Sequence, residues 1–305
     1  MPLPLSYPGL RCILENLEAV KRAYIVGHSP GLQKVDKLIS LRLKDFLIHR
    51  NELNINNLMI ICDKDEVRFN LNGKTFSRHV SESQEDKMKK LINFYIYGRS
   101  IIHLGSLDWG QSLLADFLPV GTKFRVNSLT APPWQFDTLL PFIDSRSFPL
   151  KTMATISKPS IFDSHMATSA ETLTLLSCFS VTITLEELKK LNNKRVVFER
   201  FRFSKIDIIP LIKYQMETKK ATGTTFVIPT GDKDFISEKL SEFEQAFGVY
   251  RSDLYGVKER FIFGLSKFSI PINIDSKIQV YAIEDPEEDF PYKIIVKPVP
   301  AVLAL

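Results

Sequence analysis

Apolar residues near the start of the chain recur with the period of an α-helix. The recurring positions are Leu10, Ile13, Leu14 and Leu17. Their i, i+3, i+4, i+7 spacing places four large apolar side chains on one helix face. Pro8 falls in the first turn, where proline is tolerated because the N–H groups there lack helical partners. Leu5 lies just upstream and can fold back onto the stripe. A short apolar helix here is typical of a docking element, and the predicted partner-binding face consists of Leu5, Pro8, Leu10, Ile13, Leu14 and Leu17.

After a second apolar face with helical spacing over 32–39, the pattern becomes β-type. Apolar and polar residues alternate from Leu43 to Ile60, which indicates strands. Two short runs flank Asn72-Gly73, a dipeptide that adopts positive φ at low cost and predicts a β-hairpin. Further predictions are a loop or short exposed helix over 80–90 and two strands near 91–97 and 100–107.

The second half of the chain has a longer rhythm. Its predicted strands begin near Phe124, Leu150, Leu173, Val196, Thr224 and Phe261. Most of these starts lie about 22 to 28 residues apart, a period typical of a leucine-rich-repeat-like solenoid with helices between the strands. Thr184 followed by Glu187 forms a capping box at one helix start. Segments 136–143 and 206–212 also share a pattern, which indicates either a diverged duplication or chance similarity between two amphipathic helices.

The chain closes with β-type segments at 260–265, 278–283 and 292–296, and an acidic turn over 284–289 joins the last two. These patterns predict an α/β protein with an α+β middle. Its expected parts are a short helical N-terminal module over 1–42, an antiparallel β-rich middle region over 43–118, and degenerate leucine-rich-repeat-like strand–helix units over 119–305. Stacked strand–helix units share one core and present an extended face suited to protein recognition.

Composition adds few constraints on function. The 305 residues include 40 Lys and Arg and 35 Asp and Glu, a net charge of +5. The short basic runs fall at predicted helix ends, where cations complement the helix dipole, so we interpret them as solvated surface. The Phe- and Arg-rich segment 198–203 fits a half-buried strand better than an RNA-binding strip, and nucleic acid is not expected as a partner. No segment approaches the ~18 apolar residues that a membrane span requires.

The cysteines favour a reducing compartment. Cys12, Cys62 and Cys178 are odd in number, far apart and without metal-ligand spacing. Cys12 and Cys178 lie among apolar residues, where a free cysteine is usually a small buried hydrophobe. Arg11 and Glu15 interrupt the first apolar run, so no secretory signal is indicated. We therefore expect the protein in the cytoplasm or nucleus.

The sequence offers no recognisable catalytic arrangement. Thr230-Gly231-Asp232-Lys233 lacks the spacing of a phosphate-binding loop and predicts a turn before a helix. The five histidines never pair at helical ligand spacing, and the acidic turn lacks the alternating oxygen ligands of a calcium loop. No nucleophile signature is present either. We expect no catalytic residue, no metal and no cofactor; an enzyme with an unrecognised site is a remote alternative.

The N-terminal stripe, through Leu5, Leu10, Ile13, Leu14 and Leu17, resembles the opening of an F-box, a helical module that docks on the adaptor subunit of cullin–RING ubiquitin ligases. The whole chain also resembles a nematode-expanded family of F-box-related proteins that carry a C-terminal domain of unknown function. The matching phrases are Pro4-Leu5-Ser6-Tyr7-Pro8, Ser40-Leu41-Arg42-Leu43-Lys44, Asn72-Gly73-Lys74-Thr75-Phe76, Leu140-Pro141-Phe142-Ile143-Asp144 and Ser147-Phe148-Pro149-Leu150-Lys151.

These resemblances imply a substrate-recognition adaptor of a cullin–RING ubiquitin ligase. The apolar stripe would insert into a groove of the ligase adaptor subunit, the helix-in-groove mode of binding, and the repeat face would bind an unknown protein substrate. The alternative is an interaction protein outside any ligase, whose F-box-like helix has become part of its own core. A contiguous exposed apolar patch favours the first alternative, and full burial of the stripe favours the second.

Overall fold

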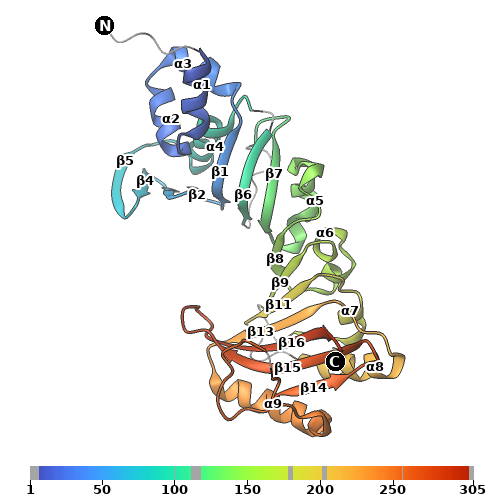
Figure 1. Cartoon of the computed structure of the whole chain (residues 1–305). Coiled ribbons are helices and arrows are strands. Elements are labelled where there is room, and N and C mark those ends of the chain that lie inside the picture. The colour runs from blue at the N-terminus through green and yellow to red at the C-terminus, as the bar shows by residue number, and fades with distance from the viewer. Residues whose placement is uncertain are drawn as a thin grey trace. The chain divides into compact units, whose positions relative to one another are not determined.

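The computed structural model of the chain describes residues 7–99, 101–110, 118–177, 181–200, 205–255 and 257–301. The chain forms two compact units, Met1–Leu150 and Lys151–Leu305, and each unit combines a sheet with packed helices (Figure 1). The predicted α/β class is therefore confirmed. The finer division into three regions stays a prediction.

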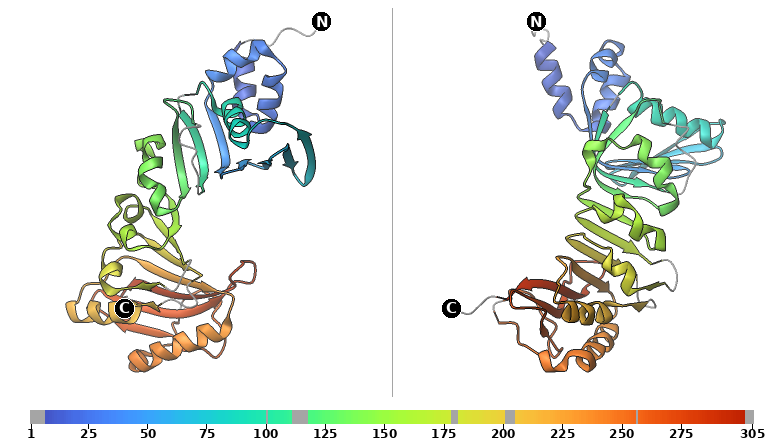
Figure 2. Two further views of the ribbon diagram at one scale, coloured as in Figure 1. Left: turned by 180° about the vertical axis from the view of Figure 1, so that it is seen from behind. Right: turned by 90° about the vertical axis from the view of Figure 1, so that its right-hand side faces the viewer.

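Three short helices open the N-terminal unit. They are α1 (Tyr7–Asn16), α2 (Ala19–Gly27) and α3 (Pro30–Lys37), shown in blue in Figures 1 and 2. Glu18 caps α2, because its carboxylate accepts a hydrogen bond of 2.9 Å from the backbone N–H of Val20. Leu14, Val26 and Ile39 bury together as the core of this group. Leu14 comes from α1 and Val26 from α2, and Ile39 follows two residues after the end of α3, whose Leu32 and Val35 pack against this core.

The sheet of the N-terminal unit has the strand order β7-β6-β1-β2-β3-β4-β5. Its strands are β1 (Leu41–Ile48), β2 (Glu52–Ile55), β3 (Leu58–Cys62), β4 (Glu66–Leu71), β5 (Lys74–His79), β6 (Ile101–Trp109) and β7 (Lys123–Thr130). Strands β1 to β5 form an antiparallel meander, whereas β6 and β7 join β1 in parallel. The predicted hairpin is confirmed: Asn72 and Gly73 join β4 to β5, both with positive φ.

The strand predicted near 91–97 is wrong, since these residues belong to α4 (Gln84–Ile96). Ser83 caps this helix, and its hydroxyl accepts a hydrogen bond from the backbone N–H of Asp86 at 3.1 Å. Met88, Ile92 and Ile96 are buried at i, i+4 and i+8. The helical period extends across the polar first half and the apolar second half of α4, so the apolar run by itself does not show it.

The C-terminal unit has the strand order β14-β15-β16-β13-β11-β9-β8. The strands are β8 (Thr152–Ile156), β9 (Thr172–Leu176), β11 (Arg195–Glu199), β13 (Thr225–Thr230), β14 (Phe268–Pro271), β15 (Ser276–Glu284) and β16 (Tyr292–Pro300). Strands β8, β9, β11 and β13 are parallel, and β16, β15 and β14 continue antiparallel from β13. A two-stranded parallel pair is formed by β10 (Thr182–Ile183) and β12 (Lys205–Ile206).

A helical segment follows each of the parallel strands. These segments include α6 (His165–Thr168) after β8, α7 (Leu185–Lys189) after β9, α8 (Ile208–Thr218) after β11 and α9 (Lys233–Phe247) after β13 (Figure 2). The capping box at α7 is confirmed, because the Thr184 N–H donates to Glu187 Oε2 at 2.8 Å and the Thr184 hydroxyl accepts from the Glu187 N–H. The turn predicted at 230–233 is also confirmed, with Asp232 as the N-cap of α9.

One further strand prediction is wrong. The β-type segment at 260–265 forms only an isolated bridge between Phe261 and Ile283, and the edge strand is β14 instead. Phe263 points fully into solvent, so this apolar run does not supply a sheet face. Segments 136–143 and 206–212 also differ locally: the first forms α5 (Phe136–Leu139) between two 3-10 turns, and the second leads from β12 into α8. Similar sequence patterns therefore adopt different local structures here.

Candidate functional site on the N-terminal helices

The predicted binding stripe on α1 divides between core and surface. Leu14 is 2% exposed and packs against Val26 and Ile39, whereas Ile13 is 48% exposed. Leu10 packs partly against this core, Leu17 is half-buried and Pro8 is exposed. Leu5 lies outside the described residues. The stripe is thus neither one exposed patch nor fully buried.

Other apolar side chains on these helices also reach solvent. They are Tyr24 and Ile25 on α2 and Leu38 just after α3. The Tyr24 ring lies 4.4 Å from the His28 ring, measured between centroids. Together with Ile13, these side chains are the large apolar side chains that the three-helix group exposes within the described part of the chain.

The expectation that Cys12 is buried is wrong. Cys12 is exposed on α1, because it lies two residues before the buried Leu14 and a helix turns by about 200° over two residues. Cys62 is buried in β3, and burial raises the pKa of its thiol to about 11. Cys178 lies outside the described residues.

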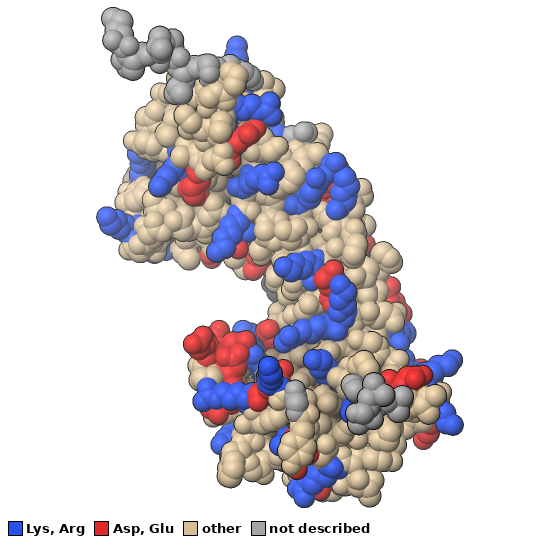
Figure 3. Space-filling view, in the orientation of Figure 1, with Lys and Arg blue, Asp and Glu red and all other residues tan. Residues whose placement is uncertain are grey.

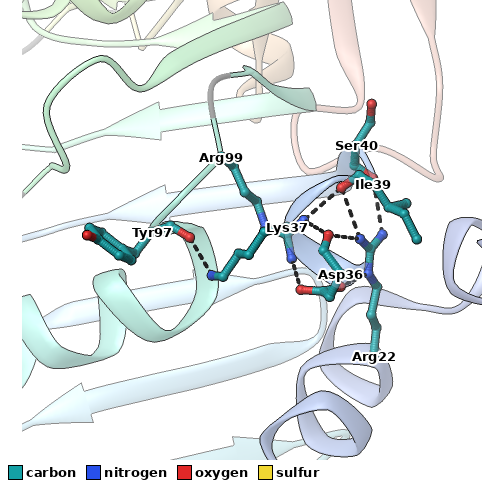
Figure 4. A network of polar contacts seen from close by, with 7 residues as sticks. All are labelled: Arg22, Asp36, Lys37, Ile39, Ser40, Tyr97 and Arg99. Carbon is teal, nitrogen blue, oxygen red and sulfur yellow. Dashed lines mark hydrogen bonds and ion pairs between the residues drawn. The ribbon is translucent and has the colours of Figure 1, made fainter. Parts of the chain in front are cut away.

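A buried ionic network fastens the helices to the sheet (Figure 4). Asp36 on α3 accepts a hydrogen bond from Arg22 Nε at 2.5 Å, and it also pairs with Arg99 Nη2. The Asp36 side chain is only 5% exposed. Since two arginines face one carboxylate, the network carries a net positive charge and depends on Asp36 for compensation.

The same guanidinium groups cap the C-terminal end of α3. Arg22 donates to the carbonyls of Ile39 and Ser40 at 3.0 and 3.1 Å, and Arg99 donates to those of Asp36 and Ile39 at 2.9 and 2.8 Å. Carbonyl groups at the end of a helix have no helical partner, and the arginines supply donors to the carbonyls around the end of α3. The network thus fixes the point where α3 passes into β1.

A cavity of about 250 Å³ lies beside this network. Its walls come from α2, α3, β1 and the residues around the end of α4, and they include Arg22, Lys37, Leu43, Phe94 and Tyr97. Lys37 donates to the Tyr97 carbonyl, and burial, followed by the charge of Arg99, lowers the pKa of Lys37. The volume is below that of most pockets that enclose a drug-sized ligand. The cavity contains cations and apolar walls but no pairing of nucleophile and base.

Sequence reasoning missed this network. Its one signal was Arg22, which interrupts the apolar positions Ala19, Ala23 and Val26 on α2. A cation among apolar helix positions indicates a buried, paired side chain. The partners Asp36 and Arg99 gave no such signal, because only the fold brings them together.

Neither a metal-binding cluster nor a membrane-spanning helix is found among the described residues. No group of three His, Cys, Asp or Glu side chains lies close enough to hold a metal ion within the ranges that the structure covers. Among these same residues, no helix has the length and apolar character needed to cross a membrane.

Comparison with known proteins identifies one family model. Residues 83–230 match a family described as Domain of unknown function (DUF3557). The match begins at the N-cap of α4 and ends with β13, so it includes the parallel strands from β6 to β13. No curated protein and no solved structure matches the chain. The chain therefore contains a domain of unknown function, and its activity has to be argued from its own residues.

Proposed function

We propose that this chain is a protein–protein interaction protein, specifically a substrate-recognition adaptor of a cullin–RING ubiquitin ligase. The observation that carries the proposal is the division of α1: Leu14 anchors the helix while its neighbour Ile13 stays half-exposed. A helix held by one buried side chain presents its remaining apolar side chains in a fixed geometry. Such a rigid apolar surface suits helix-in-groove binding to the ligase adaptor subunit.

We assign substrate recognition to the C-terminal unit. The parallel strands β8, β9, β11 and β13 begin at Thr152, Thr172, Arg195 and Thr225, with a helical segment after each. The starts are 20, 23 and 30 residues apart. We interpret these strands as degenerate leucine-rich-repeat-like units, because repeats of this class place one strand and one helical segment in about 20–29 residues and the first two spacings fall in that range. The proposal also includes the family and the location of the protein. The chain belongs with the nematode F-box-related proteins that it resembles, and it acts in the cytoplasm or nucleus.

A second candidate is an interaction protein outside any ligase. The burial of Leu14 against Val26 and Ile39 favours it, because a docking residue would have to stay accessible. In this alternative α1 is an F-box-like helix that has become part of the protein's own core, and a different surface binds the partner.

A substitution of the exposed Ile13 distinguishes the two candidates, because only the ligase candidate uses this side chain to bind the adaptor subunit. Leu14→Asp is unsuitable, since a buried carboxylate would unfold the helical group. Ile13→Asp instead changes an exposed side chain, and Val249→Asp is a matched control on an exposed residue of the C-terminal unit. We would express tagged wild type and both variants in animal cells, confirm folding by circular dichroism of the purified chains, and quantify the co-purified ligase adaptor and cullin subunits.

The ligase proposal predicts that adaptor and cullin co-purify with wild type and Val249→Asp but are lost from folded Ile13→Asp. If neither subunit accompanies the wild type, or if Ile13→Asp retains both, α1 is not the ligase dock and the second candidate stands.

A further inference from the structure

Ionisable side chains form a row across one face of the N-terminal sheet. In the strand register, Arg42 of β1 lies opposite His103 of β6, and His103 lies opposite Arg125 of β7. Segment 143–146 extends the row beyond β7, since the Asp144 N–H donates to the Phe124 carbonyl at 2.8 Å. We call Arg42, His103, Arg125, Asp144 and Arg146 the cationic row.

This row lies on the face of the sheet that points away from α2 and α4. Leu41 and Leu43 flank Arg42 in β1 and line the cavity against those helices. Because successive side chains of a strand point to opposite faces, Arg42 points the other way, and it is exposed. Lys44 is exposed two residues along β1 and adds another cation on the Arg42 side. In Figure 3, the side of the N-terminal unit turned to the viewer shows more Lys and Arg than Asp and Glu.

One carboxylate holds part of the row in place. Asp144, which is only 8% exposed, accepts hydrogen bonds from Arg146 Nη2 at 2.8 Å and from Arg125 Nη2 at 3.2 Å. These bonds hold the pKa of Asp144 well below its usual range, so it stays ionised. Arg146 nevertheless keeps 62% of its side chain exposed. Arg42 makes no side-chain hydrogen bond or ion pair within the described part of the chain.

The row therefore has more positive charge than its own carboxylate balances. Three guanidinium groups face one carboxylate, and burial together with Arg125 and Arg42 lowers the pKa of His103, which is then neutral at pH 7. Arg42 and Arg125 lie on the two strands that flank β6, with only the neutral His103 between them, so a ligand that supplies negative charge would relieve the repulsion within the row.

The cations are spread along a line and do not converge on one point. From β1 to β7 the row crosses two strand spacings, about 10 Å, and the segment beyond β7 lengthens it. A single phosphoryl group cannot reach both ends, whereas an extended peptide carries carboxylates about 7 Å apart at alternate residues. Arg125 and Arg146 already bind one carboxylate, that of Asp144. A carboxylate of a bound peptide would form the same charge-assisted hydrogen bonds with arginine.

We propose that the cationic row binds an extended acidic segment of a partner protein, with its carboxylates distributed between Arg42 on β1 and the Arg125 and Arg146 pair at β7 and beyond it. This inference is independent of the proposed ligase role, because it needs neither the adaptor subunit nor the helix α1.

The test uses the full chain and fluorescence anisotropy with three labelled probes: hexaglutamate, hexaglutamine and hexathymidylate. The variants are Arg42→Gln and Arg42→Glu, and Arg78→Gln on the exposed edge strand β5 is the matched control. We expect hexaglutamate, but not hexaglutamine, to bind at low salt and to dissociate as salt is raised. Arg42→Gln should weaken binding about tenfold or more, since a hydrogen bond to a charged group is lost. Arg42→Glu should abolish binding, and Arg78→Gln should leave it unchanged.

Several outcomes would overturn the proposal. These are failure of wild type to bind hexaglutamate, equal binding of hexaglutamine, or unchanged affinity in folded Arg42→Glu. Tighter binding of hexathymidylate than of hexaglutamate would identify a nucleic-acid surface instead.

Discussion

Replacing Asp36 by Asn should strongly destabilise the N-terminal unit. Asn has nearly the shape of Asp but no charge, so Arg22 and Arg99 would remain buried without a compensating carboxylate. Removing one partner of a buried ion pair costs about 3–5 kcal/mol. Whole domains are stable by only about 5–15 kcal/mol, so this single loss is a large fraction of the total. For a unit of this size, it corresponds to a fall in Tm of about 6–20 °C.

Intrinsic fluorescence reports this unit separately. The chain has two tryptophans, Trp109 and Trp134, and both belong to the N-terminal unit. Thermal unfolding followed by tryptophan emission therefore reports the stability around Asp36, whereas far-ultraviolet circular dichroism reports both units. We expect the fluorescence transition to shift to lower temperature and the part of the dichroism transition from the C-terminal unit to stay in place.

The matched control is Asp65→Asn, the same substitution at an exposed position of the N-terminal unit. It should change stability by no more than about 0.5 kcal/mol. The double variant Asp36→Asn, Arg99→Met should lose less free energy of unfolding than the sum of the losses in the two single variants, because the second substitution removes an uncompensated cation. A fluorescence Tm for Asp36→Asn within 2 °C of wild type, or fully additive costs in the double variant, would refute the role assigned to the network.

Three further predictions concern single side chains. Leu14→Ala should destabilise the N-terminal unit by about 2–5 kcal/mol in urea unfolding, because it leaves a cavity in the three-helix core; a loss below about 1 kcal/mol would mean that the helices do not share that core. Thr184→Ala should cost about 1 kcal/mol by removing the α7 cap, measured by circular dichroism, and no change would show that the capping box does not stabilise α7. In a Cys178→Ser background at pH 8, Cys12 should react rapidly with a thiol reagent and Cys62 only on unfolding, since Cys62 is buried and its raised pKa, about 11, keeps the thiol protonated. Equal reaction rates of the two thiols would contradict the burial of Cys62.

Local sequence determined those features that depend on residues a few positions apart. Asn72-Gly73 specified a hairpin because both residues tolerate positive φ, and Thr184 with Glu187 specified a helix start through two reciprocal hydrogen bonds. The starts of most parallel strands were also predicted, since buried strands are short apolar runs between polar breaks. The α/β class follows from these elements.

Apolar character alone did not distinguish a strand from a helix. The run at 91–97 became the second half of α4, because Ser83 caps a helix that buries Met88 and Ile92 on one face. The run at 260–265 stayed outside the sheet, where β14 pairs with β15 instead. In both cases the choice depended on which surface was available for burial, and that surface is formed by distant parts of the chain.

The fold alone determined the features that matter for binding. Helical spacing places Leu10, Ile13 and Leu14 on one helix face, but only packing against Val26 and Ile39 separates the buried Leu14 from the exposed Ile13. The positions of the charged side chains in the cationic row likewise depend on the fold. The sequence gives the number of arginines, whereas the pairing of β1 with β6 and of β6 with β7 aligns Arg42 and Arg125 with His103. Contacts between residues far apart in the sequence leave no local pattern, because such a contact fixes neither the number nor the type of the residues between its two partners.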